Sequence, residues 1–329
     1  MENSGRKKFL LVFSIIAAGC VIAAVLSLCL GAASISFGEI FTDGTVSSRI
    51  FFLVRVPRTA ACLLAGAGLA VSGALIQGVL ANSLASPGII GVNAGAGLGV
   101  TICFALGAIS GWAAAFSAFA GALFAVLTVA IAARKTSASR SAVILGGVAV
   151  NSFLTAISEA ITTLVPDVAS LSADFKTGGF SGVSYTRIIP AGIMILIALA
   201  VSLSLSNELD LLSMGEDTAQ GLGLSVKKMR SLFLVLAAVL AGASVSFAGL
   251  LGFVGLIIPN MAKRIVGSES RRVLPICAVG GGAFVTLCDC AARTVFAPYE
   301  IPTGIVMSAV GAPFFIYLLF RRKGGHSRG

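Results

Sequence analysis

Long apolar runs without charged residues, separated by short polar breaks, are the main pattern along this chain of 329 residues. The runs are continuous rather than alternating, which indicates helices and not half-buried strands. Several reach the ~20 residues that a helix rising 1.5 Å per residue needs to cross a hydrocarbon core of about 30 Å. Only helices and closed barrels satisfy their backbone hydrogen bonds in lipid, so the pattern predicts an all-α polytopic membrane protein.

The breaks divide the chain into ten expected spans. The stretch 231–262 carries no charge, and as one helix it would be nearly ~50 Å long. Because that is too long for one crossing, we expect a break near the sequence SVSFAGLLG. The first run is longer than the ~7–15 apolar residues of a cleaved signal peptide and is expected to remain as a span. The ten spans are residues 9–30, 59–80, 88–106, 112–133, 141–164, 188–205, 231–246, 252–265, 273–292 and 301–320.

The distribution of Lys and Arg tests this division. If residues 1–8 are cytoplasmic, 17 of the 23 basic residues fall in segments on the inner side. This asymmetry follows the positive-inside bias of membrane proteins. It predicts a single transmembrane domain over residues 9–320, with a cytoplasmic start and a cytoplasmic tail, residues 321–329. The basic residues expected outside are Arg49, Arg55, Arg58, Lys176, Arg187 and Arg293.

Composition agrees with a membrane protein and excludes several functions. Hydrophobic residues make up 57% and charged residues 11%, against roughly 45–50% and 25% in soluble domains. The net charge of +10 is explained by the positive-inside bias, so we expect no nucleic-acid partner. The seven Cys and one His form no metal-binding or catalytic spacing, and no phosphate-binding GxxxxGK[ST] loop occurs. An enzyme, a metal site and a bound cofactor are not expected.

Few charges fall inside the expected spans, where each costs ~2.5–3.5 kcal/mol on insertion scales. Asp289 lies four residues before Arg293, so the two can neutralise each other as a structural pair. Glu159 has no visible partner; it either faces an aqueous pathway or is protonated inside the bundle. We therefore expect this chain to lack the buried acid–base network of a proton-coupled carrier.

The longest charged stretch, residues 206–230, falls on the cytoplasmic side of the predicted topology. We expect a short helix over about residues 209–221, a glycine turn, and a segment leading into the seventh span. Such a stretch could be a solvated connector. Because apolar residues are interspersed among its charges and it is long for a connection, an amphipathic docking surface is favoured.

Small residues recur at four-residue spacing in two expected spans. Gly66, Ala70, Ala74 and Gly78 form one stripe, and residues 91, 95 and 99 form a second, all glycine. Such stripes let helix backbones approach closely in lipid. They indicate either packing within one bundle or a subunit interface.

Three segments, one near the start of the chain and two near its end, carry a family resemblance. They are RVPRTAACLLAGAGLAVSGALIQGVLANSLASPGIIGVNAGAGLG (55–99), GLLGFVGLIIPNMAKRIVGSESRRVLP (249–275) and DCAARTVFAPYEIPTGIVMSAVGAPFFIYLLFRR (289–322). Together they closely resemble the iron-siderophore, cobalamin and haem permeases of ABC importers. The resemblance implies a type II importer permease fold with ten spans and both termini cytoplasmic. It also implies a permease dimer, two cytoplasmic ABC ATPases and an extracytoplasmic substrate-binding protein.

The resemblance assigns roles at both membrane faces. In the family, outer arginines receive acidic residues of the binding protein, and Arg55, Arg58 and Arg293 match them. A planar guanidinium can grip a carboxylate with two hydrogen bonds. The alternative is that these arginines anchor the protein at the lipid headgroups. On the inner face, the resemblance implies that the loop between the sixth and seventh spans folds into two short helices that seat in a groove of the ATPase. GEDTAQGLGLSV resembles that segment, with Glu216, Ala219, Leu222 and Gly223 at the matching positions.

The family's inner gate is formed by the loops after the second and fourth spans. The matching residues here are Asn82 and Leu84 in the first loop, and Ala138 and Ser139 in the second. Ser83 stands where the family usually has Pro, and Ala138 where a hydroxyl residue is common. The resemblance therefore places the gate without fixing its chemistry.

Taken together, these features predict the permease subunit of an ATP-driven importer for an iron-siderophore chelate, in the cytoplasmic membrane of a prokaryote. Cobalamin and haem are alternative substrates. An ATPase-independent secondary carrier and a purely structural membrane protein are alternative classes. The second permease subunit could be an identical copy or a paralogue.

Overall fold

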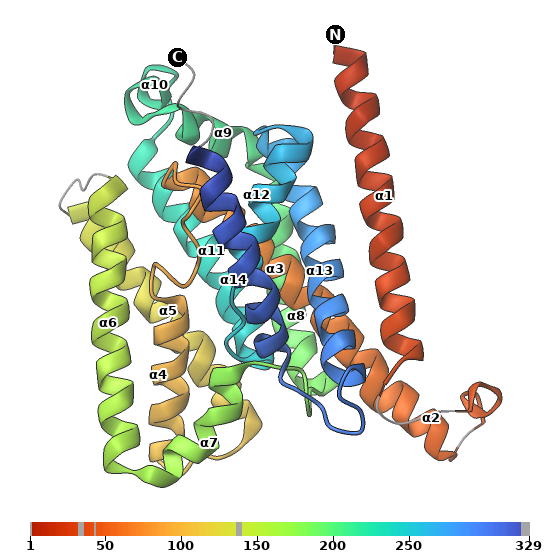
Figure 1. Ribbon diagram of the computed structural model, residues 1–329. Coiled ribbons are helices and arrows are strands. Elements are labelled where there is room, and N and C mark those ends of the chain that lie inside the picture. Colours follow the sequence, from red (N-terminus) through yellow and green to blue (C-terminus); the bar gives the residue numbers. More distant parts are fainter. Residues whose placement is uncertain (1, 32–35, 43, 136–139, 324–329) are drawn as a thin grey trace.

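The computed structural model describes residues 2–31, 36–42, 44–135 and 140–323, and all regular elements in these ranges are helical (Figure 1). Within them the all-α prediction is confirmed. Fourteen helices are joined by two irregular ones, a 3-10 turn (η1) and a π-helical segment (η2). The elements are α1 Glu2–Cys29, η1 Phe37–Glu39, α2 Val46–Ile50, η2 Phe51–Arg55, α3 Val56–Val79, α4 Val92–Ala105, α5 Gly111–Lys135, α6 Arg140–Leu164, α7 Pro166–Thr177, α8 Tyr185–Ser204, α9 Ser206–Met214, α10 Glu216–Gly221, α11 Val226–Ala248, α12 Val254–Val266, α13 Ser270–Thr294 and α14 Thr303–Lys323.

Each expected span overlaps one helix: α1, α3, α4, α5, α6, α8, α11, α12, α13 or α14. By length and composition, seven helices of the described chain could cross a membrane. One of them is the continuous helix Val46–Val79, which begins 13 residues before the expected span (59 minus 46). The other three helices that overlap expected spans are α4, α12 and α14. The apolar parts of α4 and α14 are shorter than the 18 residues taken as the minimum for a crossing, and α12 has only 13 residues. The count of ten crossings therefore stays a prediction.

The break expected in the charge-free stretch is confirmed between α11 and α12. Gly249 and Phe253, on either side of the break, both have positive φ, +68° and +65°. The backbone N–H of Leu250 donates to the Phe175 carbonyl at 2.9 Å, so the interrupted chain is satisfied by the end of α7. This contact gives the freed backbone a partner inside the protein, as a lipid-embedded chain requires.

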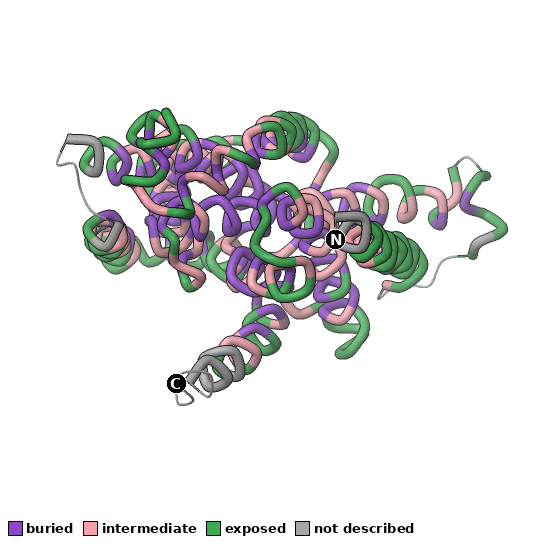
Figure 2. Tube along the Cα trace, turned by 90° about the horizontal axis from the view of Figure 1, so that it is seen from above, coloured by how far each residue is buried: buried purple, intermediate pink, exposed green. Residues whose placement is uncertain are grey.

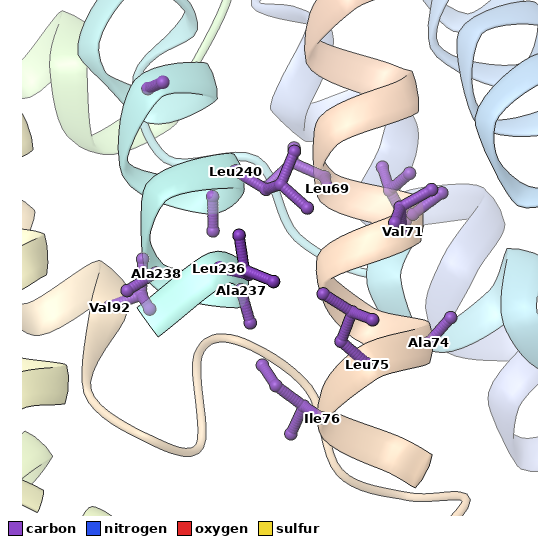
Figure 3. Close-up of a cluster of buried hydrophobic side chains, with 14 of the residues drawn as sticks. Leu69, Val71, Ala74, Leu75, Ile76, Val92, Leu236, Ala237, Ala238 and Leu240 are labelled. Carbon is purple, nitrogen blue, oxygen red and sulfur yellow. The ribbon is translucent and has the colours of Figure 1, made fainter. Parts of the chain in front are cut away.

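The core lies around α3, which packs between α11 and α13. Figure 3 shows Leu69, Leu75 and Ile76 of α3 on the side toward Leu236 and Leu240 of α11. In contrast, α1 lies at the edge of the bundle (Figures 1 and 2). Only 6% of an 18-residue apolar stretch of this helix is buried. Its apolar surface suits contact with lipid.

Both small-residue stripes pack inside this chain. In the first stripe, a Cβ at Gly66 would collide with the Gly281 carbonyl of α13, and one at Gly78 would collide with the Leu209 side chain of α9. Gly73 lies beside the stripe, and a Cβ there would collide with the Gly255 carbonyl of α12. In the second stripe, a Cβ at Gly95 would overlap the Gly121 carbonyl of α5. The interpretation as close helix packing within one bundle is confirmed for these positions.

The two ends of the helical bundle differ in what they carry. The start of α1, the end of α14 and the α9–α10 segment lie at the same end (Figure 1). That arrangement agrees with an even number of crossings. The side of the membrane that this end faces remains a prediction.

Candidate functional sites

A buried charge cluster lies at the opposite end of the bundle, at the junction of α3 and α13. Its centre is the Asp289 carboxylate, which is fully buried. Arg58 donates to both carboxylate oxygens, from Nε at 3.0 and 3.2 Å and from Nη2 at 3.0 Å. Thr303 Oγ1 donates to Oδ1 at 2.9 Å, and Arg293 Nε lies 3.1 Å from Oδ2. One carboxylate thus joins two guanidinium groups and a hydroxyl.

The expectation that this chain lacks a buried acid–base network is wrong. The i, i+4 contact between Asp289 and Arg293 is present as expected, but Arg58, 231 positions away along the chain, makes the stronger, two-pronged contact. The reason is tertiary: Arg58 lies in the first turn of α3, and Asp289 lies near the end of α13. The two meet only because α3 and α13 pack closely at small residues, where Gly66 lies against Gly281. No spacing in the sequence reports that contact.

The same cluster reaches α1 and the surface. Arg293 Nη2 donates to the Ser27 carbonyl at 3.1 Å and to its hydroxyl at 2.9 Å. The Ser27 hydroxyl also lies 2.8 Å from that of Thr59. On the other side, Arg58 Nη1 donates to Glu300 Oε2 at 2.8 Å, and the Glu300 side chain is 34% exposed. Glu300 is therefore the point where the cluster meets solvent.

Arg55 is held by the end of α1. Its Nη1 donates to the carbonyl oxygens of Leu28 and Cys29 at 2.8 and 2.6 Å. The structure thus gathers all three outer arginines at one end, but they are only 3–6% exposed. Buried guanidinium groups that bond within the chain do not have the exposed position of a lipid-headgroup anchor.

The polar stretch after α8 folds into a helical elbow of two short helices, α9–α10. The residue pattern predicted a single helix there and is corrected, whereas the family resemblance implied two short helices. Gly215 separates the two helices with a φ of +128°, a conformation that favours glycine. Leu209, Leu212 and Ala219 are almost fully buried and fix the elbow to the bundle. At its tip Leu222 is 63% exposed, although a leucine gains by burial.

Polar contacts also fix the elbow. Glu216 forms an ion pair with Arg230 in the first turns of α11. Asp210 accepts hydrogen bonds from the Ser270 backbone N–H at 2.9 and 3.1 Å, which satisfies a free donor at the start of α13. Gly223, at the turn after α10, has a φ of +82°. The elbow is therefore a folded unit that is joined to α11 and α13.

The first candidate gate loop follows α3. Asn82 Oδ1 accepts from the Leu84 backbone N–H at 2.9 Å, which forms a local turn. Asn260 of α12 donates from Nδ2 to the Ser83 carbonyl at 2.8 Å and holds this loop. Leu84 is partly exposed. Ala138 and Ser139, the second half of the expected gate, lie outside the described residues.

A cavity of about 270 Å³ connects the first gate loop to the elbow. Asn82 lines one side, Asp210 and Ser213 of α9 line another, and Lys263 of α12 extends into the same space. Lys263 Nζ donates to Gln77 Oε1 at 3.0 Å. The sequence analysis missed Gln77 and Lys263, because only the crossing of α3 and α12 brings them together. The polar Gln77 inside an apolar helix was the one signal available.

Comparisons with known proteins agree with this geometry. Residues 19–321 match the model of the FecCD transport family. The chain is 34% identical to the Fe(3+)-citrate import system permease protein YfmE of Bacillus subtilis, over 95% of this chain and 96% of the relative. It is 38% identical to the vitamin B12 import system permease protein BtuC of Citrobacter koseri, over 92% of each chain.

A solved structure has the same fold. It is described as an inward-facing conformation of a metal-chelate type ABC transporter, and it matches with a TM-score of 0.86 and 29% identity. The match covers 94% of this chain and 99% of the other. Family, relatives and fold therefore agree over nearly the whole length, and the chain belongs to the FecCD transport family, as a multi-pass membrane permease.

Proposed function

We propose that this chain is the transmembrane permease subunit of an ATP-driven importer, and that it carries an iron-siderophore chelate across the cytoplasmic membrane of a prokaryote. The observation that carries the proposal is the α9–α10 elbow. It is fixed to the bundle by buried leucines, presents an exposed leucine at its tip, and lies at the same end as both ends of the described chain. A membrane permease with no chemistry of its own needs such a contact to receive work from a separate ATPase.

The remaining partners follow from the family. Two cytoplasmic ABC ATPases would bind the elbows of two permease subunits, which are identical copies or paralogues, around a shared pathway. Residues 1–8 and 321–329 would lie in the cytoplasm, and α1 would face membrane lipid. An extracytoplasmic binding protein would deliver the chelate. Cobalamin stays as an alternative substrate, since one relative is named for vitamin B12 and another for ferric citrate. Haem stays as an alternative from the family resemblance alone.

In this mechanism the elbow moves as a unit when the ATPases close. Its link to Arg230 would pass the movement to α11, and the hydrogen bonds of Asp210 would pass it to the start of α13. The cavity shared with Asn82 would let the same movement reach the inner gate. Gate residues Leu84, Ala138 and Ser139 would then separate to release the substrate.

A charge at the elbow tip is expected to disrupt the ATPase contact. Leu222→Glu places a carboxylate on an exposed site, so folding should be unaffected while the association constant with the ATPase falls by about tenfold or more. Co-purification and ATP hydrolysis by the complex measure this. The matched control is Phe41→Glu, because Phe41 is 86% exposed, lies outside the expected spans and is away from the elbow. Equal loss in both variants, or no loss in Leu222→Glu, would argue against coupling through Leu222.

The outer arginines are proposed to receive acidic residues of the binding protein. Because Arg58 is bonded to Glu300 at the surface, an incoming carboxylate would have to replace Glu300. Glu300→Gln weakens that in-chain competitor and is expected to tighten docking by about fivefold, since a charged hydrogen bond is about twice as strong as a neutral one. Charge reversal at Arg55 should weaken docking. Binding of the purified proteins measures both, and weaker docking of Glu300→Gln would contradict this exchange.

Transport in proteoliposomes tests the proposed function. The permease, its ATPase and its binding protein are reconstituted and given radiolabelled ferric citrate, a ferric trihydroxamate or vitamin B12. Accumulation of a ferric chelate should require ATP on the side of the ATPase and should stop when the ATPase is catalytically inactive. An ionophore should leave it unchanged. Uptake without ATP that collapses with the ionophore would support a secondary carrier instead.

A further inference from the structure

A polar recess lies between α4, α6 and the end of α7, separate from the docking, coupling and gate residues. It encloses a cavity of about 440 Å³. Two asparagines, two hydroxyl residues, a carboxylate and an ammonium line it, which is unusual for a surface at membrane depth. These six residues are Asn93, Asn151, Thr155, Ser158, Glu159 and Lys176.

The recess is a built feature with a fixed floor. Ser158 is 6% exposed, and its hydroxyl lies 2.9 Å from that of Thr101, so it joins α6 to α4. Thr101 also donates to the Gly97 carbonyl at 2.8 Å. At the rim, the hydrogen bond from the Leu250 N–H to the Phe175 carbonyl holds the end of α7 beside Lys176.

Its depth follows from the length of α6. The helix has 25 residues, so it is about 37 Å long at 1.5 Å per residue. Asn151 is near its middle, and Glu159 is five residues before its end at Leu164. The recess therefore extends from the middle of α6, a helix long and apolar enough to cross a membrane, toward the end of the bundle that carries the arginine cluster.

Two charges in the recess are without partners. Glu159 and Lys176 are exposed, and within the described chain neither side chain has an ion-pair or hydrogen-bond partner. A charge that faces lipid at this depth costs ~2.5–3.5 kcal/mol on insertion scales. Because Glu159 is exposed, its side chain also does not lie inside the bundle. Of the two alternatives for Glu159, an aqueous pathway is favoured.

The opposite side of α6 has a different character. Phe153 is 66% exposed and lies two residues from both Asn151 and Thr155, so it points away from the recess. The polar residues are thus confined to one side of α6, which indicates a water-filled space on that side.

We propose that this recess is a transient contact site for the transported chelate, in the outer half of the pathway. The inference rests on the proposed transport function and adds the residues that meet the substrate. The ligand class is a polar chelate whose surface carries oxygen and amide groups: Lys176 would donate to its oxygens, Glu159 would accept from its hydroxyl or amide groups, and the asparagines would do both. The balanced charges and neutral polar groups suit a bulky chelate rather than a bare metal cation, which requires several anionic ligands.

Uptake and ATP hydrolysis are measured together in the proteoliposomes described above, with the compound that the wild type accumulates. Glu159→Gln and Lys176→Gln are expected to lower uptake by about fivefold or more, as for the loss of one charged hydrogen bond. Hydrolysis stimulated by the binding protein should change less than about twofold, because coupling is intact. The matched control is Asp174→Asn, an exposed acid on α7 outside the recess.

A second measurement reads the recess without substrate. Thr155→Cys and Phe153→Cys are treated with a charged, membrane-impermeant thiol reagent, and modification is read at each residue by mass spectrometry. Thr155→Cys should react at least about tenfold faster, because thiolates form in water and not in lipid. Equal rates, or full uptake by both charge variants, would overturn the recess proposal alone. If the wild type accumulates none of the three compounds with ATP, the proposed function fails, and the recess proposal fails with it.

Discussion

Asp289→Ala is expected to lower the free energy of unfolding by about 3–5 kcal/mol, the usual cost of removing one partner from a buried ion pair. The loss is large because Arg58 and Arg293 both depend on this carboxylate and are 6% and 3% exposed. Without it, two guanidinium groups remain close together, and only Arg58 still has an anionic partner, Glu300. Denaturant titration of the purified protein in detergent measures the change.

An exposed ion pair provides the matched control. Glu269 and Arg272 are 2.8 Å apart, with side chains 47% and 33% exposed. Glu269→Ala should cost only ~0–1 kcal/mol, because water solvates the arginine that remains. Similar losses for Asp289→Ala and Glu269→Ala would mean that the buried cluster does not hold α3 to α13.

Gly73→Ala is the second change expected to have a large effect. The added Cβ would overlap the backbone carbonyl of Gly255, at the start of α12. Backbone cannot turn aside as a side chain can, so α3 and α12 must separate, at a cost of about 1–3 kcal/mol or more. The same separation would disturb the 3.3 Å contact from Gln77 Nε2 to the Gly255 carbonyl. Unfolding measurements should therefore show a loss, and transport should fall with it.

Gly19→Ala is the control for this substitution. Gly19 lies in α1, and a Cβ there would meet no atom within 4 Å. Alanine favours a helix over glycine by about 1 kcal/mol, so Gly19→Ala should be neutral or stabilising. If Gly73→Ala were equally harmless, close approach of α3 and α12 would not be needed for stability.

How far the sequence predicted the fold depended on the range of each interaction. The helical runs, the break before Val254 and the position of the elbow follow from local composition, and the structure has each of them. The residue pattern alone predicted one helix in the elbow, because one glycine among several polar residues gives no local sign of a φ of +128° at Gly215. The family resemblance implied two short helices, and the structure has them. The lengths of the spans did not follow from composition. The helix α12 has only 13 residues, and packing against neighbouring helices stabilises such a short helix.

The site residues show the same limit. Asp289 and Arg293 are one helical turn apart, so their contact was readable. The contacts of Arg58 with Asp289 and of Lys263 with Gln77 each join helices distant in sequence, and a single chain has no pattern that reveals them. Glu159 was noticed as a charge without a partner, but only the arrangement of α4, α6 and α7 showed the recess around it.

The central claim is that the α9–α10 elbow faces the cytoplasm, where an ATPase can bind it. Ser225, exposed in the turn before α11, is a suitable reporter. Ser225→Cys is treated with a membrane-impermeant thiol reagent in intact cells and in inside-out vesicles, with the unsubstituted protein as the background. If the elbow faces the cytoplasm, Ser225→Cys is labelled in the vesicles and protected in the cells. Labelling in intact cells would place the elbow outside and contradict its role as the ATPase contact.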